Sequence, residues 1–300
     1  MLLFFSGGEH PEPLIVQFVT HYLGEPLYRF QMAYTRPLWM WIFEKVGVKA
    51  TPEQVFGVPY SPETAIPWYT VMLIIACILS VIIIGILKGK LSEDDPKNGQ
   101  LTLEAGFLAL KDMIVSVVGQ QGFNYFPVVA TFAVLILVSN LMGQFPLFMS
   151  PTAHVNVTFA LGLTSFVYYN SVGIRENGLI NHLAHLAGPK LPILIAIFIT
   201  PLIFLIESVS NLIRPMTLGL RLFANMFADE QIAFQAAHIA EPYTLWIFPV
   251  LVMPLAVFVA FVQTLVFTLL SMIYLSEVSH EHEEHEHEGE GHGDEHLATA

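Results

Sequence analysis

This chain is dominated by long apolar runs that contain no charged side chain. Three such runs cover residues 68–87, 126–150 and 155–174, and a fourth, at 243–276, continues for 34 residues without Asp, Glu, Lys or Arg. An uncharged apolar run of about 18 residues or more is long enough to cross a bilayer as a helix. Helices satisfy their backbone hydrogen bonds internally, as hydrocarbon requires. The sequence therefore predicts an all-α polytopic membrane protein.

The composition agrees with a lipid-embedded chain. Hydrophobic residues make up 54% of the 300 residues and charged residues only 12%, about half the ~25% usual in soluble domains. The formal net charge of −13 arises mainly at the C-terminal end, because residues 277–296 hold nine carboxylates and no Lys or Arg. No basic patch indicates a nucleic-acid partner, and no phosphate-binding loop ending in Gly-Lys-Ser or Gly-Lys-Thr indicates a nucleotide site.

The pattern divides the chain into three regions. Residues 1–67 are mixed and Pro-rich, and we expect an N-terminal extramembrane segment with short helices. Residues 68–276 form the predicted membrane domain, and residues 277–300 are expected to be a disordered His- and Glu-rich tail. The membrane domain is predicted to hold about five embedded helices and one amphipathic surface helix: spans at about 68–87, 126–150, 155–174, 191–235 and 243–276, with the surface helix at about 101–121.

The last two embedded segments are longer than one membrane crossing requires. As one straight helix, residues 243–276 would measure ~51 Å, against a hydrocarbon core of ~30 Å. Each of the two long helices must therefore tilt strongly, kink or break. Prolines offer kink points in both segments: Pro201, Pro215, Pro249 and Pro254.

The placement of basic residues predicts the orientation. The connections at 88–111 and 175–190 hold six of the twelve Lys and Arg residues, whereas those at 151–154 and 236–242 hold none. Basic connections tend to remain in the cytoplasm. With alternating spans, we therefore expect the N-terminus outside and the C-terminus in the cytoplasm.

The predicted span at 191–235 carries charged residues within an otherwise apolar stretch. A charge near the bilayer centre costs at least about 2.5–3.5 kcal/mol on insertion scales, so charges there usually move ions or pair with a partner. Glu207, Arg214 and Arg221 are seven residues apart and are expected to share one helix face, with Asn225 one turn beyond. Glu230 lies nine residues after Arg221, on the opposite face, which argues against a direct salt bridge between them.

Structural interpretations of these residues stay open at this point. Arg221 could be a paired residue that stabilises a helix bundle. Asp229 and Glu230 could cap the end of the helix and face water, which is the preferred interpretation for Asp229. Glu207 could lie at the cytoplasmic interface.

Cysteine and histidine offer little for metal binding. The single cysteine, Cys77, excludes an internal disulfide and a cysteine-based cluster. His182 and His185 stand at helical spacing without a third ligand, so we expect an interfacial role. The histidines of the tail could bind Zn²⁺ or Ni²⁺ weakly, but a solvated tail is the preferred interpretation. We therefore expect no metal and no cofactor.

Residues 218–230, LGLRLFANMFADE, resemble the signature of subunit a of rotary F-type ATP synthases. Three other blocks agree with that family in the same order: Asn140-Leu141-Met142-Gly143 within a span, Val155-Asn156-Val157-Thr158 opening the next, and Gln263 in the last span. The matches extend from about residue 100 to 277. An ordered set of this kind is far more specific than a lone Arg in a span.

The resemblance implies a function and a set of roles. In that family, subunit a is stationary and faces a rotating ring of c subunits, each with one carboxyl group at mid-membrane. Arg221 is then the essential cation that faces those carboxylates, with Asn225 as its polar neighbour, while Gly219 and Ala224 permit close approach of the ring. Two aqueous half-channels are expected: one open to the outside and lined by Glu230, Gln263 and Asn140, and one open to the cytoplasm that holds Glu207.

The resemblance also implies the partners. The c-subunit ring, b-type peripheral stalk subunits and the rest of the ATP synthase complex are expected, together with the lipid of a bacterial plasma membrane. Nucleotide chemistry would belong to other chains, so this chain is not expected to be an enzyme by itself. Two other classes remain as alternatives: a stand-alone ion channel or secondary transporter gated by Arg221 and Glu230, and a purely structural membrane scaffold.

Two positions depart from the better-known bacterial pattern. Some relatives have a titratable His or Glu seven residues before the last-span Gln, where this chain has Ala256. Some have Asp where this chain has Gly143. We therefore expect outside access to depend on Glu230, with help from water or from His238.

Overall fold

The computed structural model describes residues 13–47, 50–56, 61–92, 96–145, 148–178, 193–239 and 244–279. Every element in these ranges is a helix. Five of the helices there are long and apolar enough to cross a membrane, so the chain is an all-α polytopic membrane protein, as predicted. These helices are α4 (Trp68–Lys88), α6 (Phe126–Met142), α7 (Val155–Asn177), α9 (Ile193–Ile239) and α10 (Thr244–Ser279).

Several helix ends differ from the sequence-based bounds by a few residues, and those of α6 and α10 bear on the site. α6 ends at Met142, eight residues before the expected end at 150, and the 3₁₀-helix η4 (Pro151–Ala153) leads into α7. A Cβ atom on Gly143 would lie 2.8 Å from the Cβ of Ser150, so the chain folds back against a position that has no side chain. α10 continues to Ser279, which makes Glu277 part of a helix rather than the start of the tail.

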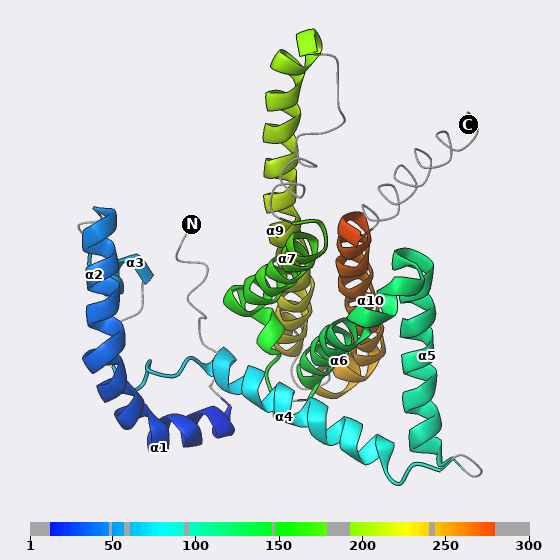
Figure 1. The fold of residues 1–300 in the computed structure, drawn as a ribbon. Helices are drawn as coiled ribbons and strands as arrows, with labels where there is room; N and C mark the ends of the chain where they lie inside the picture. The colour runs from blue at the N-terminus through cyan, green and yellow to red at the C-terminus, as the bar shows by residue number, and fades with distance from the viewer. Residues whose placement is uncertain are drawn as a thin grey trace.

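α9 and α10 are both continuous helices. α9 has 47 residues with Pro201 and Pro215 in its interior, and α10 has 36 residues. Neither helix breaks, so tilting or bending must fit them to the bilayer. At 1.5 Å per residue, α9 spans about 70 Å, more than twice the hydrocarbon thickness. Its first turns extend beyond the other helices (Figure 1).

α5 (Asn98–Val118) occupies the region of the expected surface helix. It is not one of the five apolar helices, and it runs beside α10 and across the end of α4 (Figure 1). Its residues Ile114 and Val118 are buried against Met272 of α10. The hydroxyl of Ser276 donates to the Val117 carbonyl at 2.7 Å. α5 therefore holds the last turns of α10.

The N-terminal segment is more helical than expected. α1 (Leu14–Phe30), the π-helical turn η2 (Gln31–Thr35) and α2 (Arg36–Val46) follow one another without a gap, and the short α3 (Pro52–Phe56) comes next. Among the described residues, α1 and η2 contact the rest of the chain through apolar packing and a hydrogen bond. Val16 is buried against Met72 of α4, and Gln31 donates to the Ala65 carbonyl at 2.9 Å.

α7 and α9 touch through two glycines. A Cβ atom on Gly162 would lie 2.5 Å from the Pro215 carbonyl oxygen, and one on Gly219 would lie 2.8 Å from the Thr158 carbonyl oxygen. Backbone therefore packs on backbone, as small residues permit between membrane helices. This contact fixes the rotation of α9, with Leu218 and Leu222 buried in the core.

We expect Gly162→Ala to destabilise the protein. The added methyl group meets the backbone of α9, which cannot move aside as a flexible side chain would, so the overpacking should cost about 1–3 kcal/mol. Gly85→Ala on α4 is the matched control, because nothing lies within 4 Å of its Cβ position. The measurement is the midpoint of thermal unfolding in detergent. An equal midpoint for the two variants would contradict the close contact.

Candidate functional site

Arg221 lies on an exposed face of α9. The adjoining face of α9, with Leu218, Leu222 and Met226, is fully buried in the helix core. The exposed neighbours of Arg221 are apolar or small, and they include Leu220 and Ala224. Within the part of the chain that the structure describes, no acidic group pairs with Arg221. The alternative of a cation paired inside the bundle therefore finds no partner there.

Gly219 does not belong to this exposed face. It is buried against Thr158 of α7, so the expectation that it permits approach of a ring is wrong. The reason is the one-residue offset from Leu220, since adjacent helix positions point about 100° apart. Ala224 is exposed, and it lies one turn from Leu220 on the same side as Arg221.

Arg214 has a different environment from Arg221, although the two are seven residues apart. Its Nη2 donates to Glu277 Oε1 at 2.9 Å and to Glu207 Oε1 at 3.3 Å, and its Nη1 also bonds Glu277. The guanidinium lies 5.3 Å from the ring centroid of Tyr274. Arg214 thus joins α9 to the last turns of α10. The sequence missed Glu277, because it stands at the edge of the acidic tail.

Further polar side chains lie between the ion pairs of Arg214 and α7. The Tyr169 hydroxyl donates to Asn211 Oδ1 at 2.6 Å, and Asn211 Nδ2 donates to Asn170 Oδ1 at 3.4 Å. On the outer side of α9, a shallow hollow of about 360 Å³ is lined by Ser210, Arg214 and others. Tyr169 and Asn170 lie on α7, outside the motifs that drew attention in the sequence.

Asn225 and Gln263 meet between α9 and α10. Asn225 Nδ2 donates to Gln263 Oε1 at 2.6 Å, and Gln263 is only 2% exposed. Both residues were singled out in the sequence, 38 positions apart, and the structure brings them together. Gln263 Nε2 is buried and has no partner in the described ranges.

A series of polar groups leads from Asn140 of α6 toward Glu230 of α9. The Thr152 hydroxyl donates to Asn140 Oδ1 at 2.7 Å and lies 2.7 Å from the Ser150 hydroxyl. The Ser150 backbone N–H faces the Glu230 carboxylate and interacts with it electrostatically. Asn140 is fully buried, and its Nδ2 has no partner among the described residues. The sequence did not indicate Ser150 or Thr152 as site residues. It had assigned Ser150 to the end of a span and Thr152 to the connection after it.

Neither Asp229 nor Glu230 caps a helix end. α9 continues for nine residues beyond Glu230, to Ile239. Both residues are half-buried, so the expectation that Asp229 faces water at a helix end is wrong. The apolar residues after Glu230 allow the helix to continue.

The two departures from the bacterial pattern have different surroundings. Gly143 packs against Ser150, so an Asp would have no room there, and the Ser150 backbone serves the Glu230 carboxylate instead. Ala256 is buried on α10. His238 lies in a stretch of α9 whose side chains are outside the described set, and His182 and His185 fall outside the described residues.

His154 follows Thr152 by two residues, and the sequence analysis did not single it out. It stacks on Tyr69 with 3.9 Å between ring centroids, and its Nδ1 accepts the Asn156 backbone N–H at 3.3 Å, which caps α7. Burial lowers the pKa of His154. A neutral imidazole therefore stands at the start of α7, and its Nδ1 is the acceptor.

The chain is similar over most of its length to known proteins. The family model described as ATP synthase A chain matches residues 69–276. ATP synthase subunit a of Solibacter usitatus is 37% identical over 74% of this chain and 91% of its own length. That of Aquifex aeolicus is 35% identical over 68% and 94%, and that of Syntrophobacter fumaroxidans is 32% identical over 78% and 93%.

The membrane helices, the polar side chains between α9 and α10, and these sequence similarities all indicate the same family. The matched region begins at Tyr69 and contains all of the candidate residues from Asn140 to Gln263. The chain belongs to the ATP synthase subunit a family.

Proposed function

We propose that this chain is the stator proton channel of a rotary ATP synthase, which passes protons to and from the carboxylates of a rotating c ring. The observation that carries the proposal is Arg221. It is an exposed cation in a membrane helix with no ion-pair partner among the described residues. A charge at such a position is costly unless a partner compensates it. A carboxylate on a neighbouring subunit is the partner that fits.

The polar groups at the Glu230 end of α9 support an outside half-channel. Glu230, Ser150, Thr152 and Asn140 form a series of polar groups toward the interior. The amide nitrogens of Asn140 and Gln263 are buried without a protein partner in the described ranges. Buried donors normally bond to something, and a water chain is the partner that would also conduct protons.

The polar groups at the Glu207 end support a half-channel on the cytoplasmic side. Glu207 and Arg214 lie about two or more turns before Arg221 along α9, and the hollow beside them extends to Thr217, about one turn from Arg221. Glu207 is part of a charged group rather than a lone carboxylate. In this proposal, the charged side chains of Arg214 and Glu277 keep water at the cytoplasmic opening of this half-channel.

The mechanism follows from the cost of charge in lipid. A rotor carboxyl group that faces lipid must be neutral. Near Arg221 its pKa falls, because an opposite charge favours the ionised form, and the proton leaves through one half-channel. The ionised group passes Arg221 and takes a proton from the other half-channel. Arg stays charged throughout, and it also blocks direct proton flow between the two sides.

We propose the c ring, b-type stalk subunits and the bacterial plasma membrane as the surroundings of this chain. The orientation has the N-terminus outside and the C-terminus in the cytoplasm. Four lysines between α4 and the middle of α5 support it: Lys88, Lys90, Lys97 and Lys111.

We expect the C-terminal tail to resist protease added outside intact cells. The basic connections keep α4's end and the last turn of α10 on the cytoplasmic side, so residues 280–300 should be cut only after the membrane is opened. The measurement is loss of a C-terminal epitope, compared before and after permeabilisation. Cleavage in intact cells would reverse the orientation.

The test of the function is reconstitution. The chain should purify with a c ring and a soluble ATPase head, and the complex in liposomes should pump protons when ATP is added. A stand-alone channel would conduct without the ring, and a scaffold would leave pumping unchanged when Arg221 is replaced. Either result would exclude the proposed function.

A further inference from the structure

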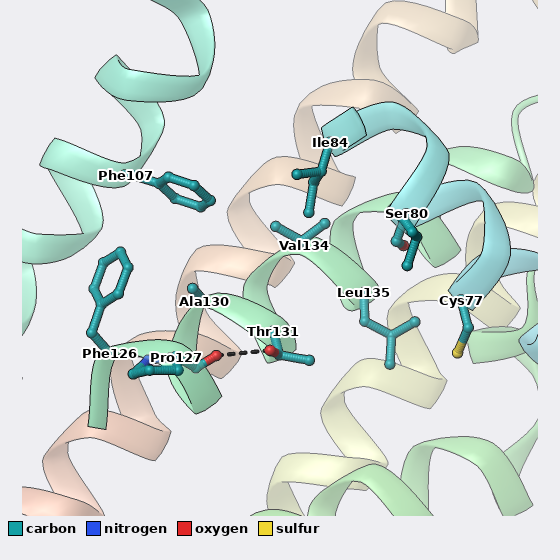
Figure 2. Close-up of a pocket in the computed structure, with 11 residues that line it drawn as sticks. Cys77, Ser80, Ile84, Phe107, Phe126, Pro127, Ala130, Thr131, Val134 and Leu135 are labelled. Carbon is teal, nitrogen blue, oxygen red and sulfur yellow. Dashed lines mark hydrogen bonds between the residues drawn. The ribbon is translucent and has the colours of Figure 1, made fainter. Parts of the chain in front are cut away.

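An apolar pocket lies between α4, α5 and α6, away from Arg221 and the polar residues of the candidate site. Its volume is about 480 Å³, within the usual range for ligand pockets. Figure 2 shows Cys77 and Ile84 on α4, Phe107 on α5, and Ala130 and Leu135 on α6 around it. α4 and α5 touch where Gly99 meets the Leu87 backbone, and the pocket opens beyond that contact.

The lining of the pocket is suited to hydrocarbon. Its two hydroxyl groups are already bonded within their own helices: Ser80 donates to the Ala76 carbonyl at 2.7 Å and Thr131 to the Pro127 carbonyl at 2.7 Å. No charged side chain lines the pocket. Because α4 and α6 are membrane-spanning helices, the pocket lies at the depth of the acyl chains. From Cys77 to Ile84 it follows α4 for about 10 Å.

A lysine follows the pocket lining on each of two helices. Lys88 is one helical turn after Ile84, and Lys111 is one turn after Phe107. The Nζ of Lys111 lies 5.7 Å from the Phe123 ring centroid, and Phe123 stacks on Phe126, which lines the pocket. Both lysines are exposed. A negative headgroup above the pocket would therefore meet two ammonium groups.

Two acidic residues also lie on this part of α5, outside the pocket lining. Glu104 is held by Gln100 Nε2 at 2.7 Å on the side of α5 that meets the chain after α4. Asp112 is exposed and adjacent to Lys111, on the next position around the helix. Neither carboxylate lines the pocket.

We propose that this pocket binds one acyl chain of an anionic phospholipid, with the headgroup phosphate held by Lys88 and Lys111. The acyl chain fills the space between α4 and α6 and supports α5, which in turn holds the end of α10. The site is separate from the proton path, and it would exist whether or not the chain conducts protons.

The test uses the intact complex in liposomes that contain a phospholipid with a photoactivatable diazirine in its acyl chain. After irradiation, adducts are mapped by peptide mass spectrometry. We expect adducts at residues 77–84 and 126–135. Thr131→Phe fills the pocket and should reduce them several-fold. Thr164→Phe is the matched control, because Thr164 is also exposed and bonds the carbonyl four residues back, at 2.7 Å, on α7.

The headgroup is tested by comparing phosphatidylglycerol and phosphatidylcholine probes. Two lysines near the surface should give phosphatidylglycerol an advantage of about tenfold or more, which Lys88→Gln with Lys111→Gln should remove. Arg29→Gln with Lys45→Gln removes the same charge elsewhere and should leave the preference intact. Equal adducts in Thr131→Phe, no headgroup preference, or cross-links only to a partner subunit's helix would each overturn the proposal.

Discussion

Arg221→Ala should give a complex that assembles fully and does not pump protons. The side chain is exposed on α9 and has no ion-pair partner among the described residues, so its removal leaves no buried charge unpaired. Without a fixed cation, an approaching rotor carboxyl group keeps its proton. We expect ATP-driven pumping in liposomes to fall by about 10²–10³-fold or more, as when a preorganised charge is removed from an active site.

Two further variants sharpen this test. Arg221→Lys should restore little, because an ammonium group loses its proton more readily when it is desolvated. Arg29→Ala is the control, since Arg29 is also exposed but pairs only with Glu25 on α1. Subunit composition must be checked in each preparation. Substantial pumping by an assembled Arg221→Ala complex would rule out the mechanism, and failure to assemble would favour the structural role.

Glu230→Gln should slow proton-driven ATP synthesis and leave assembly intact. Its carboxylate ends the series from Asn140 through Thr152 and Ser150, and an amide keeps the shape of the side chain without its ability to take up and release a proton. We expect a loss of about 10-fold to 100-fold, because a positioned acid or base commonly contributes at least that much. The measurement is the ATP synthesis rate under an imposed pH difference.

Asp229→Asn is the matched control for Glu230→Gln. The two carboxylates are adjacent on α9, and both are half-buried, but among the described residues the Ser150 backbone interacts with Glu230 and not with Asp229. Asp229→Asn should keep most of the synthesis rate. Equal rates for the two variants and the unmodified complex would leave Glu230 without a titrating role.

The sequence was sufficient for the helices and for several residues of the site. Long apolar runs, four of them uncharged, predicted all five spanning helices, because hydrocarbon leaves a buried segment no other way to bond its backbone. The ordered motifs identified the family before any geometry was known. The resemblance implied that Asn225 neighbours Arg221 and that Gln263 lines the outside half-channel, and the structure joins the two side chains by a hydrogen bond.

The tertiary structure decided which polar groups meet. A seven-residue spacing placed Arg214 and Arg221 on one face. Among the described residues, however, only Arg214 has acidic partners, because α10 ends beside it and supplies Glu277. Likewise, Glu230 reaches Asn140 only through Ser150 and Thr152, which arrive there because the chain folds back against Gly143. Helical periodicity predicts the direction of a side chain from its own axis, but its partners come from segments distant in sequence. Their positions depend on how the helices pack against one another.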